Sequence, residues 1–537
     1  MANLSEDEFV DLVRSGRAEA PAGATIVVPL GLRLLSDQLT PVLCYRRLVA
    51  PDDRTAPSFL LESVEGGERQ GRHSILGAQP ALEVVARGCE VTITDHRGGT
   101  RTHREEADPL GVPRRLTESW RLVHPPSAPD RPPLPGAMLC GWVGYAAYDT
   151  VRYAEPGKLA FESAPPDDRN LPDLALALYD NVVVFDHVDK VVHVIAAAIV
   201  APGEDPGGRY RAAVDRLESR AGEIQRHARP LASGRIDRHV PAGPVESNIT
   251  PEQHAGMVER ALEYIRAGDV FQVVLGQRFE RVSEADPIDV YRTLRAVNPS
   301  PYMVYLQARG CILVASSPEI LCRVRRDGDG RLIVTNRPLA GTRPRGSSPE
   351  QDAALERELL ADAKERAEHV MLVDLGRNDV GRVAEAGSIR LPRVMEVERY
   401  SHVMHISSTV TGRLRPGLDA WDALRAALPV GTVSGAPKIR AMQIIDELEP
   451  IRRGPYGGGL GYVGLDGQMD IALALRTIVV PTQMRSGGNW TYHVQAAGGI
   501  VADSDPGAEY QETVNKAAAL LGAIDLGEHA FGGGRTC

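Results

Sequence analysis

Hydrophobic and polar positions alternate in short runs between residues 40 and 200, and glycine and proline separate the runs. This pattern is typical of an antiparallel sheet. The strand-like runs are VLCYRRLV at 42–49, LEVVARG at 82–88, EVTITD at 90–95, NVVVFD at 181–186 and KVVHVIAAAIV at 190–200. A charged stretch from Tyr210 to Arg226 reads as a helix, so the first half of the chain is expected to be α+β.

The second half of the chain begins with a helix signal. Thr250 is a natural N-cap, a proline follows it, and Gln253 completes a capping box, so the pattern predicts a helix that ends near Gly268. The strand-like FQVVLGQRFE comes next. A similar start signal at Ser348 predicts a longer helix that runs to about Leu375.

A polar segment rich in proline and glycine, RPLASGRIDRHVPAGPVESN, separates the two halves. We place the main boundary in this segment. The division is an N-terminal domain over 1–240, a C-terminal domain over 250–525 and a C-terminal tail over 526–537 that ends in Cys537.

Composition and charge narrow the class of protein. The 537 residues carry a formal net charge of -10, which argues against general nucleic-acid binding, so an anionic ligand needs local positive charge. The six cysteines are far apart and form no C-x-x-C pair, which argues against a disulfide framework or a zinc site. The acidic start and the short apolar runs predict a cytoplasmic protein without membrane segments.

Carboxylates recur at helical spacing in two places. Glu365 and Glu368 lie three residues apart in the second predicted helix and run directly into an apolar stretch. Glu509, Glu512 and Lys516 share one side of a helix that is expected after a proline near the end of the chain. Four carboxylates on two helices suit a hard cation such as Mg²⁺. The alternative is two unrelated acidic surfaces.

Two glycine-bearing segments could approach an anion. GTVSGAPKIRA at 431–441 opens a helix with free backbone N–H groups, although it lacks the spacing of an ATP-binding Walker loop. In RRGPYGGGLGY the glycines around Tyr456 allow close approach of backbone to a ligand or to another strand. Arg476 follows the apolar ALAL and is interpreted either as a carboxylate-binding guanidinium or as half of a structural ion pair.

Three further features are ambiguous by themselves. His405 lies in an apolar strand, where a hydrogen-bonded core histidine is the ordinary interpretation, and Glu319 follows a serine-proline strand end, a common location for catalytic groups. RPLAGTRPRG at 337–346 is interpreted as a turn crowded with arginines.

Taken together, the motifs resemble those of the chorismate-utilising enzymes, and most closely the anthranilate synthase component I family. The motifs occur in the same order and spacing over residues 30 to 525, and they are densest after residue 250. They are VFQVVLGQR, ASSPE, NRPLAGTRPRG, KERAEHVMLVDLGRND, RYSHVMHISS, GTVSGAPK, RRGPYGGGLGY, MDIALALRT and AGGIVADSDPGAEYQET.

The resemblance implies a fold and a reaction. The fold is an α/β sandwich with two large stacked antiparallel β-sheets flanked by helices. The reaction is the Mg²⁺-dependent conversion of chorismate and ammonia to anthranilate and pyruvate, the first committed step of tryptophan biosynthesis.

The resemblance also implies roles for individual residues. Glu368 and Glu512 would be the magnesium ligands, supported by Glu365 and Glu509, and Glu319 would be the general acid on the C4 hydroxyl. His405 and Thr432 match residues that position the substrate and assist loss of pyruvate, with their individual roles left open. The substrate-binding set would be Ala340, Thr342, Tyr456, Arg476, Gly498, Gly499 and Lys516.

Two positions separate this chain from related activities. Gln272 stands where isochorismate-forming relatives have a lysine that activates water, so a water nucleophile is disfavoured. Ala340 stands where aminodeoxychorismate synthases have a nucleophilic lysine that redirects the amine to C4, so ammonia would add directly at C2. An aminodeoxychorismate synthase component I and a catalytically silent tryptophan-binding regulator are the alternatives.

A second site and a partner are also implied. Two motifs, SFLLESVEGGE and NPSPYMVYL, resemble the tryptophan feedback pocket of the family, and this would make the N-terminal domain regulatory. The inhibitor would contact Leu61, Glu62, Ser63, Pro301, Tyr302 and Met303. No cysteine lies in a G-x-C-x-G elbow, so the ammonia would come from a separate glutamine amidotransferase subunit in a hetero-oligomer such as a heterotetramer.

Overall fold

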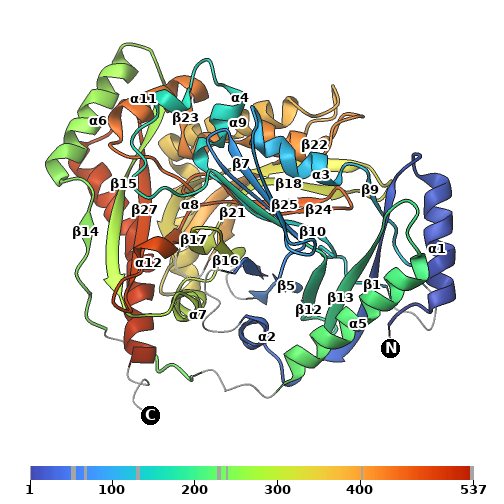
Figure 1. Cartoon of the computed structure of the whole chain (residues 1–537). Helices are drawn as coiled ribbons and strands as arrows, with labels where there is room; N and C mark the ends of the chain where they lie inside the picture. Colours follow the sequence, from blue (N-terminus) through green and yellow to red (C-terminus); the bar gives the residue numbers. More distant parts are fainter. Residues whose placement is uncertain are drawn as a thin grey trace.

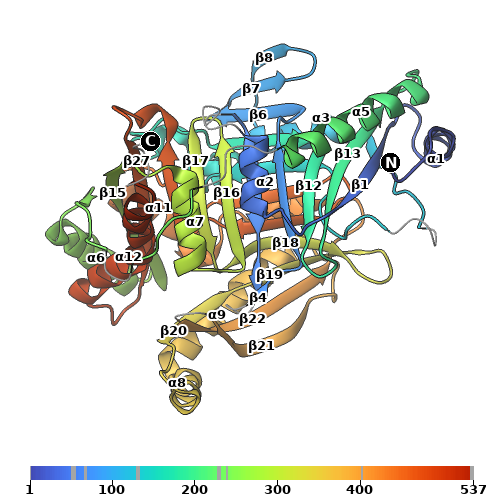
Figure 2. The same ribbon diagram turned by 90° about the horizontal axis from the view of Figure 1, so that it is seen from below.

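Two large β-sheets lie face to face in the middle of the molecule, and helices cover their outer faces (Figures 1 and 2). The computed structural model describes residues 2–49, 56–65, 69–127, 133–226, 232–237, 240–400 and 403–532. Cys537 lies outside the described residues. The expected sandwich of two stacked, largely antiparallel sheets is confirmed.

The first sheet has 13 strands, and β15 and β27 form a long antiparallel pair within it. Neighbouring strands run antiparallel except for β1 and β9, which pair in parallel. The strands in spatial order are β14 (Glu246–Ser247), β15 (Gln272–Ser283), β27 (Trp490–Ile500), β26 (Thr477–Pro481), β17 (Cys311–Ser317), β16 (Tyr302–Ala308), β2 (Ser58–Glu62), β5 (His73–Ala78), β12 (Asn181–Asp186), β13 (Val191–Val200), β1 (Thr25–Leu35) and β9 (Trp120–Leu122), with β23 (Gly435–Ala436) beside β15.

The second sheet has 12 strands, and a separate two-stranded ribbon joins β3 (Val64–Glu65) to β4 (Arg69–Gln70). The strands of the second sheet in spatial order are β20 (Leu339–Pro344), β22 (Val403–Arg413), β19 (Leu332–Arg337), β18 (Ile320–Arg326), β25 (Met469–Leu473), β24 (Gly459–Gly464), β10 (Gly141–Ala146), β11 (Leu174–Tyr179), β6 (Leu82–Arg87), β7 (Glu90–Asp95) and β8 (Thr100–Glu105), with β21 (Arg390–Arg399) beside β22.

The described helices number twelve, and five short 3-10 turns accompany them. The helices are α1 (Glu6–Glu19), α2 (Pro41–Leu48), α3 (Val112–Thr117), α4 (Val151–Ala154), α5 (Pro206–Gln225), α6 (Pro251–Arg266), α7 (Pro287–Val297), α8 (Pro349–Ala361), α9 (Ala363–Gly381), α10 (Ala420–Ala427), α11 (Lys438–Leu448) and α12 (Pro506–Gly532). The 3-10 turns are η1 (Pro109–Gly111), η2 (Tyr148–Thr150), η3 (Phe161–Ser163), η4 (Gly431–Val433) and η5 (Thr482–Met484).

Apolar side chains fill three layers. Between the sheets, Phe59 and Val304 of the first sheet belong to one buried cluster with Tyr145 and Leu460 of the second. A second cluster joins the outer face of the first sheet to α1, α2, α5, α7 and α12. A third joins the outer face of the second sheet to α9 and α10. Each sheet therefore buries both faces, which gives four layers from helices to helices.

Both sheets mix strands from either side of the predicted boundary near residue 240. In the first sheet β2 from the N-terminal half pairs with β16, and in the second sheet β10 pairs with β24. The two halves of the chain thus share one framework, and residues from both halves can meet in a single site. Helix α12 extends to Gly532, so residues 526–532 of the predicted tail are helical, and the Phe531 ring lies under the Arg292 guanidinium of α7 at 4.3 Å.

The expectation of a strand at 42–49 is wrong, because this segment forms α2. Thr40 caps the helix by accepting a hydrogen bond from the Leu43 N–H at 3.2 Å, and Pro41 occupies the first turn. Pro41, Cys44, Tyr45 and Leu48 are buried at helical spacing. The cap signal of threonine followed by proline was the stronger local information.

Two further expectations need correction. The helix expected from Ser348 to about Leu375 is two helices, because the Asp362 carboxylate accepts hydrogen bonds from the Lys364 and Glu365 N–H groups and begins α9. The segment interpreted as a turn around residue 340 is the strand β20, with a bulge at Gly341, whose φ is +68°. The helix predicted from Thr250 is confirmed as α6, including its capping box.

Candidate active site

Two adjacent glycines of β27 bring separate parts of the chain together. A Cβ atom at Gly498 would lie 3.0 Å from Glu509 Oε2 and 3.9 Å from Glu512 Oε1. A Cβ atom at Gly499 would lie 2.5 Å from Gln272 Nε2. A side chain at either position would crowd Glu509 or Gln272, so glycine favours the close approach of these side chains to the backbone.

Gln272 connects this backbone to the second carboxylate pair. Its Nε2 donates a hydrogen bond to Glu368 Oε1 at 3.3 Å, while its buried Oε1 has no hydrogen-bond partner in the described part of the chain. Glu368 of α9 and Glu512 of α12 therefore approach the same stretch of β27 from different helices. The structure brings together the two acidic pairs that lie more than 140 residues apart in the sequence.

The four carboxylates carry negative charge that Arg343, 3.4 Å from Glu365, and Lys516, 2.6 Å from Glu512, offset only in part. Burial raises the pKa of Glu365, and the neighbouring Glu368 raises it further. Burial likewise raises the pKa of Glu509, a hydrogen bond with Ser504 opposes this, and Glu512 adds a smaller rise. Glu509 Oε2 is buried and has no hydrogen-bond partner among the described residues. Like charges at one site disfavour ionisation of both members, and a cation between them removes that penalty.

The donor set fits Mg²⁺, because all four side chains offer hard oxygen ligands. Within the described ranges, no three His, Cys, Asp or Glu side chains are already gathered as a metal cluster. The two helices thus supply the carboxylates as separate pairs. Lys516 offsets part of the charge, since its Nζ lies 2.6 Å from Glu512 Oε1 and donates to the Ala497 carbonyl at 2.9 Å.

Glu319 is a carboxyl group suited to donate a proton. It lies between β17 and β18 and is 4% exposed, and burial raises its pKa to about 8. Thr432 Oγ1 of η4 donates a hydrogen bond to Glu319 Oε1 at 3.1 Å, which lowers the pKa by a smaller amount. Glu319 is therefore largely protonated at neutral pH, as a general acid requires.

His405 is a neutral imidazole whose proton can be placed. Its Nδ1 lies 2.9 Å from the Gly341 carbonyl oxygen and 3.1 Å from Thr342 Oγ1. A carbonyl oxygen only accepts, so Nδ1 carries the proton and Nε2 is left as an acceptor. Burial, and next the positive charge of Arg476, lower the pKa of His405 to about 4.

Arg476 and Tyr456 frame the other side of the site. Tyr456 is buried and packs against Val274 and Ala497 of the strand pair β15 and β27. Arg476 has a φ of +45°, a left-handed conformation that is strained for a residue with a side chain. Its guanidinium forms no ion pair with a carboxylate among the described residues, which favours the interpretation as a carboxylate-binding group.

The arginines of 337–346 are scaffolding. Each one pairs with carboxylates of neighbouring elements, and together they fix the end of β19 and the strand β20 against β21, α8 and α9. The partners are Glu398 for Arg337, Asp352 for Arg345, and Glu358, Asp362 and, at 3.4 Å, Glu365 for Arg343. This bracing holds Gly341 next to the site, since a Cβ atom there would lie 3.2 Å from Glu365 Oε2. Ala340, half-buried in the same strand, pairs with Ile406 one residue from His405.

Two buried ion pairs around the site were not anticipated from the sequence. Lys438 Nζ and Asp379 Oδ1 lie 2.7 Å apart and join α11 to α9. Arg453 binds Glu449 with two hydrogen bonds at 2.9 and 2.6 Å and also donates to the Val274 and Val433 carbonyls. The sequence did offer a signal for these ion pairs. GTVSGAPK and RRGPYGG consist mainly of small or apolar residues, and each contains a charged residue that needs a partner when it is buried.

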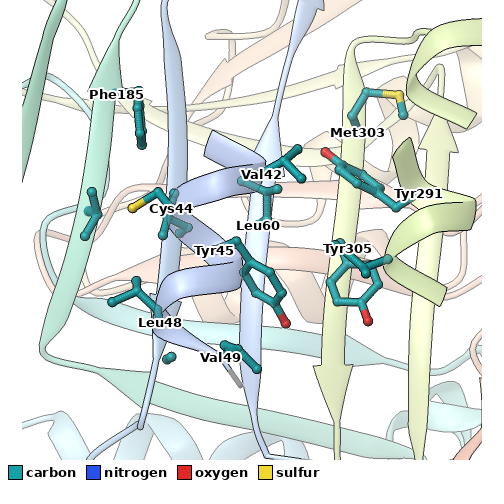
Figure 3. Close-up of a cluster of buried hydrophobic side chains, with 14 of the residues drawn as sticks. Val42, Cys44, Tyr45, Leu48, Val49, Leu60, Phe185, Tyr291, Met303 and Tyr305 are labelled. Carbon is teal, nitrogen blue, oxygen red and sulfur yellow. The ribbon is translucent and has the colours of Figure 1, made fainter. Parts of the chain in front are cut away.

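The two segments predicted to contact an inhibitor are neighbours. They lie on the paired strands β2 and β16, in which Met303 is opposite Glu62. Glu62 is buried, accepts a hydrogen bond from the Tyr291 hydroxyl at 2.6 Å, and contacts Arg295 at 3.0 Å. Figure 3 shows Tyr291, Met303 and Tyr305 side by side in this part of the core. Glu62 is thus a buried carboxylate that is held by Tyr291 and Arg295.

The remaining predicted contacts surround this strand pair. Leu61 is opposite Val304, and Pro301 directly precedes β16. The Tyr302 hydroxyl donates to Asp470 Oδ1 at 2.8 Å. The Ser63 carbonyl accepts from the Gly71 N–H at 2.7 Å. Binding of tryptophan here stays a prediction.

The fold and the paired carboxylates define a class of protein. A sequence model of the family described as chorismate binding enzyme matches residues 57–522, so the chain belongs to this family.

Within this family the chain is similar to anthranilate synthase subunits. Anthranilate synthase alpha subunit 1, chloroplastic, of Arabidopsis thaliana is 53% identical over 529 residues, which cover 95% of this chain and 87% of the relative. Anthranilate synthase component 1 of Pseudomonas aeruginosa is 44% identical, with 98% and 100% covered. The crystal structure of anthranilate synthase component I from Streptococcus pneumoniae TIGR4 has a TM-score of 0.70 and 36% identity, with 91% and 99% covered.

Two further observations concern the cysteines and the helices. The described cysteines are free, and four of them are buried. A search of the described helices finds none that combines the length and the apolar character required to cross a membrane.

Proposed function

We propose that this chain is the large subunit of an anthranilate synthase, which converts chorismate and ammonia to 2-aminobenzoate, pyruvate and water. The observation that carries the proposal is the meeting of Glu368 and Glu512 at Gly498 and Gly499, beside a protonated Glu319 and a neutral His405. The full-length similarity to anthranilate synthase subunits supports it.

Binding rests on charge complementarity. Glu368 and Glu512 would hold Mg²⁺, with Glu365 and Glu509 in support; when bound, the metal supplies positive charge for the ring carboxylate of chorismate. The backbone of Gly498 and Gly499 would help to hold that carboxylate. The unpaired guanidinium of Arg476 and the hydroxyl of Tyr456 would hold the enolpyruvyl carboxylate.

The first step is addition of ammonia at C2 with loss of the C4 hydroxyl. Glu319 donates its proton to the C4 oxygen, so that water leaves rather than hydroxide, and Thr432 orients the carboxyl group. Both ring double bonds shift, from C1=C2 and C5=C6 to C1=C6 and C4=C5, as the C2–N bond forms and the C4–O bond breaks, and the added nitrogen then loses one proton. Burial of Glu319 keeps the proton available at neutral pH.

The second step is aromatisation with loss of pyruvate. His405 Nε2 is unprotonated and can accept the C2 proton while the C3–O bond to the enolpyruvyl group breaks. The Gly341 carbonyl holds Nδ1–H and so fixes the tautomer that this step needs. Loss of pyruvate leaves the aromatic 2-aminobenzoate.

Ala340 determines where the amine enters. It lies in β20 next to Gly341 and has no amine of its own, so it leaves C2 open to free ammonia. Gln272 is engaged with Glu368 and is not a base, which disfavours water as the nucleophile. Both features support a 2-amino product over a 4-amino or hydroxylated one.

Supply and control of the reaction complete the proposal. A glutamine amidotransferase subunit would deliver ammonia in a hetero-oligomer, since no cysteine of this chain lies in a nucleophile elbow. Tryptophan would bind at Glu62, Ser63 and Met303 and reduce activity. The free cysteines support a reducing, cytoplasmic location.

The test is a fluorescence assay of the purified chain with chorismate, ammonium and Mg²⁺. We expect 2-aminobenzoate fluorescence to rise with time, to vanish when Mg²⁺ is chelated, and to fall when tryptophan is added. Tryptophan binding without turnover would instead identify a silent regulator and refute the enzymatic proposal.

A further inference from the structure

A cavity of about 480 Å³ lies in the N-terminal half of the chain, between α2, α5 and the ends of β2 and β5. This volume is within the range of small-molecule sites. None of the residues assigned to the reaction or to tryptophan lines it. Ser58, at the first position of β2, is on its wall, whereas Glu62 is at the last position of that strand.

The walls of the cavity are of two kinds. Leu48, Val49, Pro57 and Pro80 provide an apolar side. The polar side contains the charged groups of α5 and of the turns after β7 and β11. They are Arg97, Asp180, Arg216, Arg220 and Glu223. A ligand of this cavity is therefore expected to have an apolar body and a charged end.

The cavity is lined by three arginines but by only two carboxylates. Arg97 pairs with Asp180, and Arg220 contacts Glu223 at 3.0 Å. Arg216 forms no ion pair with any described carboxylate. Its Nη2 donates to the Ala197 carbonyl at 3.0 Å, and its buried Nε has no hydrogen-bond partner within the described ranges. Three guanidinium groups thus face two carboxylates, which leaves the Arg216 charge uncompensated.

Burial also makes the positive charge of these arginines less favourable. It lowers the pKa of Arg216 and of Arg220, and it lowers the pKa of Arg97 to about 10, with the charge of Arg216 as the next cause. Crowded, half-buried guanidinium groups are stabilised by an anion that binds among them. A carboxylate offers the planar, bidentate geometry that matches a guanidinium.

We propose that this cavity is a second ligand site, which binds a small carboxylate with an apolar body. The carboxylate pairs with Arg216, and the body packs against Leu48, Val49 and Pro80. The cavity reaches the surface beside Gln79 and Ser219, both of which are exposed, so a ligand can enter without a change of fold.

The direct test is a binding titration of the full chain with 2-naphthoate, followed by its fluorescence. We expect saturable binding, at least about tenfold weaker for the neutral isostere 2-naphthamide and at least about tenfold weaker for Arg216→Gln. Arg209→Gln, on the same helix but outside the cavity, is the matched control and should bind as the unmodified chain does.

Two more variants locate the binding. Arg476→Gln removes the cation of the proposed active site, so naphthoate binding that is lost in this variant and kept in Arg216→Gln would overturn the proposal. Ser219→Trp places a large side chain at the exposed mouth and should block binding even if Arg216→Gln does not fold. Equal binding of naphthoate and naphthamide, or no binding at all, would also overturn it.

Discussion

Thr432 donates a hydrogen bond to Glu319 across two elements that are 113 residues apart, at 3.1 Å, and the carboxyl group that accepts it is nearly excluded from water. The bond opposes the effect of burial, which raises the pKa of Glu319 to about 8. The acid of the proposed reaction is thus adjusted by two opposing local effects.

The pH dependence follows from that balance. Because Glu319 must be protonated to act, kcat/KM should be constant below its pKa and fall as the pH rises through about 8. Removing the hydrogen bond in Thr432→Val raises the pKa further, so the alkaline limb should move to higher pH. The measurement is kcat/KM against pH for both proteins.

Glu319→Gln is the companion variant. Without a proton donor, kcat should fall by about 10²- to 10⁴-fold while the melting temperature stays near that of the unmodified protein. An alkaline limb at the same pH in Thr432→Val and in the unmodified chain would show that another group causes it.

The carboxylates of α9 and α12 should act as metal ligands. Glu368→Gln and Glu512→Gln each remove a charged oxygen ligand, so activity should fall by at least about a hundredfold at any Mg²⁺ concentration tested. The rise in melting temperature that Mg²⁺ gives the unmodified chain should disappear. Asp374→Asn, an exposed site on α9, is the matched control and should keep both responses. Full activity in both glutamate variants would refute the assignment.

Ala340 should determine the fate of C2. In Ala340→Lys an amine stands where ammonia would attack, so 2-aminobenzoate formation should drop at least about tenfold, and a covalent adduct of the chain with the substrate skeleton should be detectable by mass spectrometry. Ala340→Met adds similar bulk without an amine. If the methionine variant loses the same activity and the lysine variant forms no adduct, then bulk alone explains the effect.

The paired strands β2 and β16 should carry feedback inhibition. The region around Ser63 is tightly packed, since a Cβ atom at Gly71 would lie 2.7 Å from Ser63 Cβ. Ser63→Phe should therefore fill or distort the pocket and raise the tryptophan concentration needed for half inhibition by at least about tenfold, with kcat little changed. The control variant Ser486→Phe, which lies in an exposed turn, should be inhibited by tryptophan to the same degree as the unmodified chain. An unchanged inhibition curve for Ser63→Phe would remove these strands from the account.

Local sequence signals predicted the elements that are stabilised by residues close in the sequence. The capping box at Thr250 predicted α6 because the cap and the helix are stabilised by neighbouring residues. Residues 42–49 were misread because Tyr45 and Leu48 suit a strand as well as a helix; the cap at Thr40 and packing against β5 decide the outcome. The break at Asp362 depends on one carboxylate turning back onto the chain.

The site itself was predicted by resemblance, and periodicity alone would not have found it. Spacing suggested that the carboxylates of two helices could hold a cation, but it left open whether the two helices meet, because that meeting depends on the backbone of Gly498 and on Gln272. The buried pair of Lys438 and Asp379 depends on the docking of α11 against α9, which no local pattern encodes.

Product analysis with ¹⁵N-ammonium, chorismate and Mg²⁺ shows at which ring carbon nitrogen enters. We expect all incorporated ¹⁵N to be in 2-aminobenzoate, with one pyruvate released per aromatic product. A ¹⁵N-labelled 4-amino product, a hydroxylated product without nitrogen, or unreacted chorismate would contradict this expectation.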